Sequence, residues 1–179
     1  MVDRCNATGI CQHLAMTQSK RASESESRLT WIVQPQDLNI HGTLFGGQLL
    51  ALMDRVAAMV AMRHTRSYCL TVSIDKVDFM APVRHGYMLD LVARVHFTAR
   101  TSMEIYVVAH SEYPLSGERT MVCEAFFSFV AVDEDGKPKP LVAVELETEQ
   151  DRRLNQEAKA RYDERKQGIN KGRTAIKGR

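Results

Sequence analysis

Asp54 is the residue whose surroundings most clearly require a chemical explanation. It stands in the middle of residues 48–64, a segment made mostly of apolar residues with high helix propensity. A carboxylate in such a setting carries a large desolvation cost unless it is paired or faces a cavity. Two roles therefore stay open: an acid–base or nucleophilic group in a water-poor site, and a structural ion pair with an arginine of a neighbouring strand or subunit.

Gly46 and Gly47 stand at the start of this predicted helix. Glycine lets other groups approach the backbone closely, and the first N–H groups of a helix have no intrahelical acceptor. The helix dipole adds positive potential at the same place, so a tetrahedral oxyanion could bind there. Tight packing of the helix on a sheet would explain the two glycines equally well.

Gly47 and Asp54 cannot act on one reacting carbonyl from the same helix. Seven positions at 1.5 Å per residue separate them by about 10 Å along the helix axis. If both take part in one reaction, the oxyanion donor must come from one chain and the carboxylate from another. A two-fold dimer would arrange them in this way.

The loop before the helix contributes Asn39 and His41. Asn39 carries both a donor and an acceptor, which suits the orientation of a water or a substrate oxygen. An Asx-type turn in a loop bounded by Pro and Gly is the alternative role for this side chain. His41 precedes a glycine, a position more typical of hydrogen bonding or packing, and we do not assign it as the main base.

Composition and motifs narrow the class of protein. The sequence has no G-x-S-x-G elbow, H-E-x-x-H helix, P-loop or G-x-G-x-x-G turn, so neither a cofactor nor a metal site is expected. The four cysteines lack C-x-x-C spacing and are expected to be reduced thiols in a cytoplasmic protein. A net charge of +2 does not favour nucleic acid or membrane partners. The longest apolar stretch, residues 49–62, is interrupted by charges and is too short to span a membrane.

The elements that must position these residues are one helix and a sheet. The segments after the helix are rich in β-branched and aromatic residues and are joined by short turns, which predicts an antiparallel meander. A shorter strand is expected before the helix, which is apolar on almost every face and should be surrounded by protein. These features predict an α+β fold in which a long antiparallel sheet wraps around one central helix. The predicted strands are residues 29–33, 69–80, 88–99, 102–112 and 119–132.

The rest of the chain has a different character. Residues 1–27 are polar, without a helix or strand period, and are predicted to be a flexible leader. Residues 28–144 form the predicted domain. Residues 145–168 are predicted to be a highly charged amphipathic helix, and residues 169–179 a basic, disordered tail.

Residues 39–54, NIHGTLFGGQLLALMD, resemble the N-x-x-G-x-x-F-G-G-x-x-(L/M)-x-x-M-D signature of the hot-dog acyl-CoA thioesterases. The similarity continues through residues 75–86 and 101–108 and ends near residues 126–140. It is strongest to the bacterial YciA-type enzymes and to the cytosolic acyl-CoA hydrolases of animals, which carry two such domains in one chain. The predicted fold is therefore a hot-dog fold with an added charged C-terminal helix.

The resemblance implies a role for each of the residues above. Asp54 would be the catalytic carboxylate, acting as general base or as nucleophile, and Asn39 with the amides of Gly46 and Gly47 would hold the thioester. The substrate would be an acyl-CoA, with no separate cofactor, and the protein a homodimer, assembled by family analogy into a trimer of dimers. By position in the family pattern, the coenzyme phosphates are expected near Arg84, with Thr101 and Ser102 as lesser candidates.

Two other functions of the same fold stay open from the residues. A hot-dog hydratase or dehydratase usually carries a histidine on the central helix or its loop, where this chain has Asp54. A non-catalytic acyl-CoA sensor would bind its ligand without cleaving it. Retention of both Asn39 and Asp54 disfavours the sensor, and no basic helix-turn-helix segment is visible.

Overall fold

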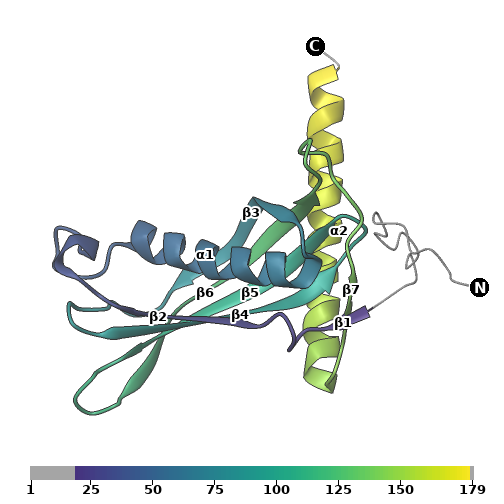
Figure 1. The fold of residues 1–179 in the computed structure, drawn as a ribbon. Helices are drawn as coiled ribbons and strands as arrows, with labels where there is room; N and C mark the ends of the chain where they lie inside the picture. The colour runs from purple at the N-terminus through teal and green to yellow at the C-terminus, as the bar shows by residue number, and fades with distance from the viewer. Residues whose placement is uncertain (1–18, 178–179) are drawn as a thin grey trace, which may run out of the picture.

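The computed structural model describes the backbone of residues 19–177 and the side chains of residues 19–167. A five-stranded sheet forms the centre, with α1 on one face and α2 on the other (Figure 1). None of the described helices is long and apolar enough to cross a membrane. In chain order the elements are β1 (Ser19–Arg21), β2 (Ser27–Ile32), the short helix η1 (Pro35–Asp37), α1 (Gly46–Thr65), β3 (Tyr68–Phe79), β4 (Met88–Thr98), β5 (Ser102–Glu112), β6 (Arg119–Val132), β7 (Ala143–Glu145) and α2 (Glu149–Lys177).

The sheet has the strand order β2-β4-β5-β6-β3, and all its pairs are antiparallel. The predicted meander is present for β4, β5 and β6, but it was wrong for β3, which pairs with β6 rather than with β4. The chain between β3 and β4 crosses the end of the sheet. Val83 lies in this connection, and its backbone oxygen accepts a hydrogen bond from the Leu44 N–H. Strand β3 is consequently an edge strand with one side unpaired.

Helix α1 packs one face against the sheet and leaves the other face exposed. The sequence prediction of a helix surrounded by protein was therefore wrong for the single chain, because the five strands curve around only one side of it. Arg55, Met59 and Met62 lie on the exposed side. The buried residues recur every three or four positions, as one helical face requires: Leu49, Leu52, Met53, Val56, Ala57, Val60, Ala61 and His64.

Helix α2 begins at Glu149, four residues later than predicted, because Thr148 and Asp151 cap it. The Asp151 N–H donates to Thr148 Oγ1 at 3.1 Å, and the Thr148 N–H donates to Asp151 Oδ2 at 2.9 Å. Its backbone continues to Lys177, so most of the segment predicted to be a disordered tail is helical, and no proline interrupts it. Residues 178 and 179 lie outside the described residues.

The prediction of a flexible leader up to residue 27 was wrong for residues 19–27. Strand β1 pairs in parallel with β7, and Ser25 and Ser27 are buried. The Ser25 hydroxyl lies 2.8 Å from His64 Nδ1 at the end of α1. These partners are more than 35 residues away in the chain, so no local sequence pattern predicts the contacts. Residues 1–18, the rest of the predicted leader, lie outside the described residues.

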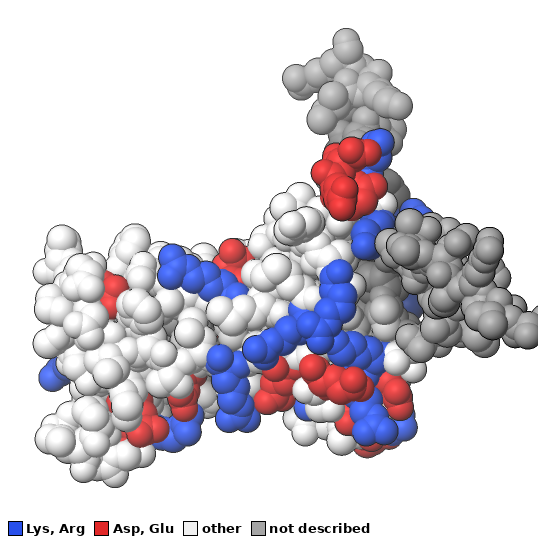
Figure 2. Space-filling model, in the orientation of Figure 1, with Lys and Arg blue, Asp and Glu red and all other residues white. Residues whose placement is uncertain are grey.

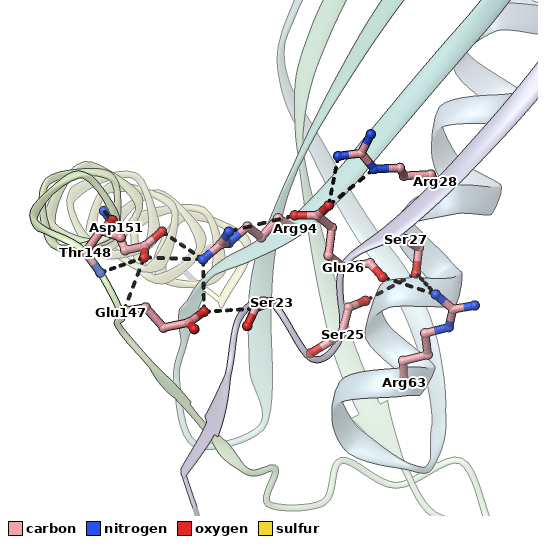
Figure 3. Close-up of polar contacts among 10 residues, drawn as sticks. All are labelled: Ser23, Ser25, Glu26, Ser27, Arg28, Arg63, Arg94, Glu147, Thr148 and Asp151. Carbon is pink, nitrogen blue, oxygen red and sulfur yellow. Dashed lines mark hydrogen bonds and ion pairs between the residues drawn. The ribbon is translucent and has the colours of Figure 1, made fainter.

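Arg94 of β4 ties this N-terminal segment to α2 (Figure 3). Its guanidinium lies 3.8 Å from Glu26, 3.2 Å from Glu147 and 3.3 Å from Asp151. Three carboxylates thus converge on one half-buried cation, which compensates their mutual repulsion.

We expect Arg94→Met to lower the free energy of unfolding by about 2 kcal/mol, because it leaves three carboxylates without their shared cation. Chemical denaturation of the purified variant measures this. Arg153→Met is the matched control: Arg153 pairs with Glu157 on the exposed side of α2, and its loss should change stability by less than about 1 kcal/mol. Equal effects of the two substitutions would contradict a structural role for the Arg94 cluster.

His96 is buried beneath α2, 6 % exposed, with its ring stacked on that of Tyr106 at 5.2 Å. Asn155 of α2 donates to the His96 backbone oxygen at 2.7 Å. Burial, together with the nearby Arg94 charge, lowers the pKa of His96 from 6.5 to about 4. The imidazole is therefore neutral in the folded protein at neutral pH.

This lowered pKa predicts a loss of stability in mild acid. The unfolded chain binds more protons than the folded one between pH 6.5 and about 4. The free energy of unfolding should consequently fall by up to about 3 kcal/mol as the pH drops through that window. Denaturation curves of wild type and His96→Gln across pH 4–7 check this, and the slope contributed by His96 should disappear in the variant. Identical slopes would contradict the assignment.

Candidate active site

The Asp54 carboxylate lies on α1 and faces β3. Its Oδ1 accepts a hydrogen bond from Thr71 Oγ1 at 2.8 Å. Thr71 pairs with Phe129 of β6, a core residue, so its side chain is on the sheet face that α1 covers. Within the described part of the chain, no arginine or lysine forms an ion pair with Asp54. The single chain therefore holds the carboxylate through a neutral hydroxyl and leaves its other oxygen available.

Thr71 cannot be recognised as a site residue from the sequence. Threonine is common in strands, so one more in a segment rich in β-branched residues gives no signal of its own. Only the packing of α1 on β3 brings it to Asp54, 17 positions earlier in the chain.

Gly46 and Gly47 form the first turn of α1, as predicted. The helix begins after Phe45, which provides no side-chain cap, and the Gln48 and Leu49 N–H groups both donate to the Phe45 oxygen. Among the described residues, no acceptor is found for the N–H groups of Gly46 and Gly47. Both remain available to a ligand oxygen.

Packing also bears on these two glycines, most clearly on Gly47. A Cβ on Gly47 would lie 2.5 Å from the Phe45 ring, and one on Gly46 would lie 3.4 Å from the Phe79 ring. The contact of Gly46 with β3 is an ordinary one, so packing on the sheet does not by itself explain the two glycines, whereas a side chain at position 47 would have to displace the Phe45 ring.

Asn39 forms an Asx-type turn within its own loop. Its Oδ1 accepts the His41 N–H at 2.8 Å and the Thr43 N–H at 3.3 Å, and its Nδ2 donates to Thr43 Oγ1 at 3.0 Å. The Asx-type turn, which the sequence left open as the alternative role of Asn39, is thus present in the single chain. One amide hydrogen of Nδ2 is not used by this turn.

An apolar pocket of about 300 Å³ opens beside Gly46. Toward this end of α1 the surface is largely uncharged, whereas cationic and acidic side chains interleave toward the other end (Figure 2). An alkyl chain could occupy such a pocket with its carbonyl near the first N–H groups of α1. The lining residues are Leu44, Gly46, Leu49, Phe79, Met80, Ala81, Pro82 and Val83.

The three candidate residues for phosphate binding lie in two places. Arg84 forms a β-bridge with Thr43, so the fold brings it to the Asn39 loop. Thr101 and Ser102 lie at the far end of β4, whose 11 residues span about 35 Å. Within a single chain, Thr101 and Ser102 are therefore far from Arg84. Among the residues that the structure describes, no three His, Cys, Asp or Glu side chains lie together as a metal site would require.

Comparison with known proteins decides the family. The model of the family described as "Thioesterase superfamily" matches residues 41–117, from the Asn39 loop through β5. The uncharacterized acyl-CoA thioester hydrolase YkhA of Bacillus subtilis is 38% identical over 149 residues, which cover 83% of this chain and 87% of that protein. The chain belongs to the thioesterase superfamily.

Other relatives agree with this family. A hexameric acyl-CoA thioesterase crystallised in its apo form is 47% identical, with a TM-score of 0.81, over 85% of this chain and 97% of that one. The rat cytosolic acyl coenzyme A thioester hydrolase is 34% identical over 86% of this chain. The chain spans only 41% of that longer protein. These likenesses confirm the predicted hot-dog fold.

The Staphylococcus aureus acyl-CoA hydrolase gives a comparison at single positions. Its structure in complex with butyryl coenzyme A is 33% identical to this thioesterase-superfamily chain, with a TM-score of 0.81. Alanine variants of an asparagine, an aspartate and a threonine of that enzyme have been crystallised. Its asparagine precedes the aspartate by 15 positions and its threonine follows by 17. Asn39, Asp54 and Thr71 have the same spacing.

Proposed function

We propose that this chain hydrolyses acyl-CoA thioesters to a carboxylic acid and free CoA. The observation that carries the proposal is the Thr71–Asp54 hydrogen bond, which holds a carboxylate without a cationic partner on the face of α1. The shared spacing of Asn39, Asp54 and Thr71 with the S. aureus hydrolase supports the same conclusion.

Two chemical routes are open to Asp54. As general base it would take a proton from water, whose oxygen attacks the thioester carbon and expels the CoA thiolate. As nucleophile it would attack the thioester carbon and expel the CoA thiolate, which forms an anhydride that water then hydrolyses. In both routes the N–H groups of Gly46 and Gly47 would stabilise the oxyanion, and Asn39 would orient the thioester through its unused amide hydrogen. Thiolate is a good leaving group, so a carboxylate can suffice.

The site that we propose is shared between two chains. Gly47 and Asp54 are about 10 Å apart along one helix, which is too far for both to contact one reacting carbonyl. Strand β3 offers the surface for pairing: it is an unpaired edge with exposed Tyr68 (71 %), Leu70 (55 %) and Val72 (59 %). Two copies joined along β3 by a two-fold axis would place their α1 helices side by side.

The relatives support a proposal for higher assembly and for location. The thioesterase y2039 of Yersinia pestis, 34% identical with a TM-score of 0.61, is hexameric, which supports a trimer of dimers here. In such an assembly, Thr101 and Ser102 of one chain could approach Arg84 of another around the coenzyme phosphates. The cytosolic rat relative supports a cytoplasmic location.

Thiol release from a panel of acyl-CoAs of increasing chain length tests the proposal. The full-length protein should release CoA thiol catalytically, with many turnovers per chain. Stoichiometric binding of intact acyl-CoA without thiol release would instead identify a sensor. Hydration or dehydration of enoyl or hydroxyacyl thioesters, with the thioester bond intact, would identify a hydratase.

Thr71→Val tests the positioning role of the hydroxyl. It keeps the β-branched shape but removes the donor to Asp54, so we expect kcat to fall about 10-fold with little change in KM. Thr71→Ser, which keeps the hydroxyl, should restore most of the activity. Equal losses in both variants would indicate packing and contradict the role.

A further inference from the structure

A second pocket lies on the opposite face of the sheet, between the strands and α2. Its volume is about 300 Å³. The sheet separates it from α1, because α1 and α2 lie on opposite faces (Figure 1). We call it the α2 groove; it is lined by Val72, Ser73, Phe97, Ser102, Met103, Glu104, Ser128, Val130, Tyr162, Arg165 and Lys166.

The floor of the α2 groove is a row of polar side chains across three strands. Ser128 of β6 pairs with Ser73 of β3 on one side and with Glu104 of β5 on the other. Ser128 is only 5 % exposed, yet within the described part of the chain its Oγ has no hydrogen-bond partner. A buried hydroxyl without a partner is rare in native proteins, since it loses its hydrogen bonds to water. Because the Ser128 hydroxyl lines the groove, we expect a polar group of a ligand to be its partner.

The cations of α2 give the α2 groove an excess positive charge. Arg165 binds Asp75 at 2.6 Å and Glu104 at 3.4 Å, and Arg161 binds the fully buried Glu104 at 2.6 Å. These two arginines balance the two carboxylates. Lys166 adds one more cation, and no described carboxylate forms an ion pair with it. The surplus is one positive charge, which matches a monoanion.

The remaining walls are apolar. Val72, Val130, Phe97 and the ring of Tyr162 surround the polar floor, with the Phe97 and Tyr162 rings 5.4 Å apart. A ligand that satisfies this lining needs a single anionic head with hydrogen-bond acceptors and an alkyl or aryl body.

We propose that the α2 groove binds an amphiphilic monocarboxylate, such as a medium-chain fatty acid. Its carboxylate accepts a hydrogen bond from Ser128 Oγ and pairs with Lys166, and its alkyl chain packs against Val72, Val130 and the two rings. The sheet lies between the α2 groove and the face of α1 that carries Asp54, and Ser102, a lesser candidate for the coenzyme phosphates, is the one lining residue that the two proposals share.

Calorimetric titration of the full-length protein with decanoate tests this site. Ser128→Leu fills the α2 groove and Lys166→Glu reverses its surplus charge, and each should weaken this binding at least 10-fold. Lys159→Glu is the matched control, because Lys159 lies on the same helix, pairs with Asp163 and does not line the groove. Lys166→Glu alters an exposed helix position, so it keeps the test decisive even where Ser128→Leu does not fold.

Three results would overturn the proposal: no binding of decanoate, binding that survives both groove variants, or displacement of decanoate by CoA. The last would make the α2 groove part of the substrate site. All of these readouts are independent of thiol release, so failure of this proposal can be told apart from failure of the proposed hydrolase activity.

Discussion

Asp54→Asn should lower kcat for thioester hydrolysis by at least about 10²-fold, as loss of a general base or nucleophile predicts. Asparagine keeps the size of the side chain and can still accept the Thr71 hydrogen bond, but it cannot take a proton from water. Because the substitution removes a group needed in the transition state, KM should change little. Continuous detection of released thiol measures the effect on both constants.

Asp163→Asn provides the control for removal of a negative charge. Asp163 lies on α2, where it pairs with Lys159 on the side of the sheet away from α1. Its replacement should leave kcat within about 2-fold of wild type. If Asp54→Asn retained near wild-type turnover while thiol release by the wild type was confirmed, the active site would have to be sought elsewhere on the chain.

Mixing two inactive variants should restore about a quarter of wild-type activity if the site is shared between chains. Gly47→Val disturbs the first turn of α1, because its side chain would meet the Phe45 ring, and Asp54→Asn removes the carboxylate. With random pairing, half of the dimers contain one chain of each kind. One of the two sites in such a dimer then has an intact helix start from one chain and an intact Asp54 from the other.

Co-refolding the two variants at equal concentrations and following thiol release performs this experiment. Each variant refolded alone is the baseline, and circular dichroism establishes that both fold. Where Gly47→Val does not fold, Asn39→Ala takes its place as the loop variant. Activity of the mixture no greater than the mean of the two separate variants would show that each chain carries a complete site, which would contradict the composite arrangement.

Local patterns predicted most of the elements closely. The helix was predicted over residues 48–64 and spans Gly46–Thr65, and β5 was predicted at its observed bounds, Ser102–Glu112. High helix propensity and runs of β-branched residues act over a few neighbouring positions, so they can be recognised without the fold. The N-terminal position of Gly46 and Gly47 and the mid-helix position of Asp54 follow from the same local signals.

Tertiary contacts decided the features that the sequence analysis missed. Strand β3 reaches the sheet edge beside β6, and residues 19–27 join the fold through partners distant in the chain. Glu104 of β5 is completely buried, and α2 supplies the two arginines that bind it. Such pairings depend on which surfaces meet after the chain has folded, and no period in the sequence encodes them.

The candidate site divides in the same way. The sequence by itself determined the types of group available: a carboxylate at Asp54 within an apolar helix, glycines at its start and an amide at Asn39 in the preceding loop. Only the tertiary structure decided that the Thr71 hydroxyl binds Asp54, that Asn39 is largely used by its own turn, and that Thr101 lies far from Arg84. The physical reason is that residue type and helical spacing are local properties, whereas the partner of a side chain is fixed by the packing of α1 on the sheet.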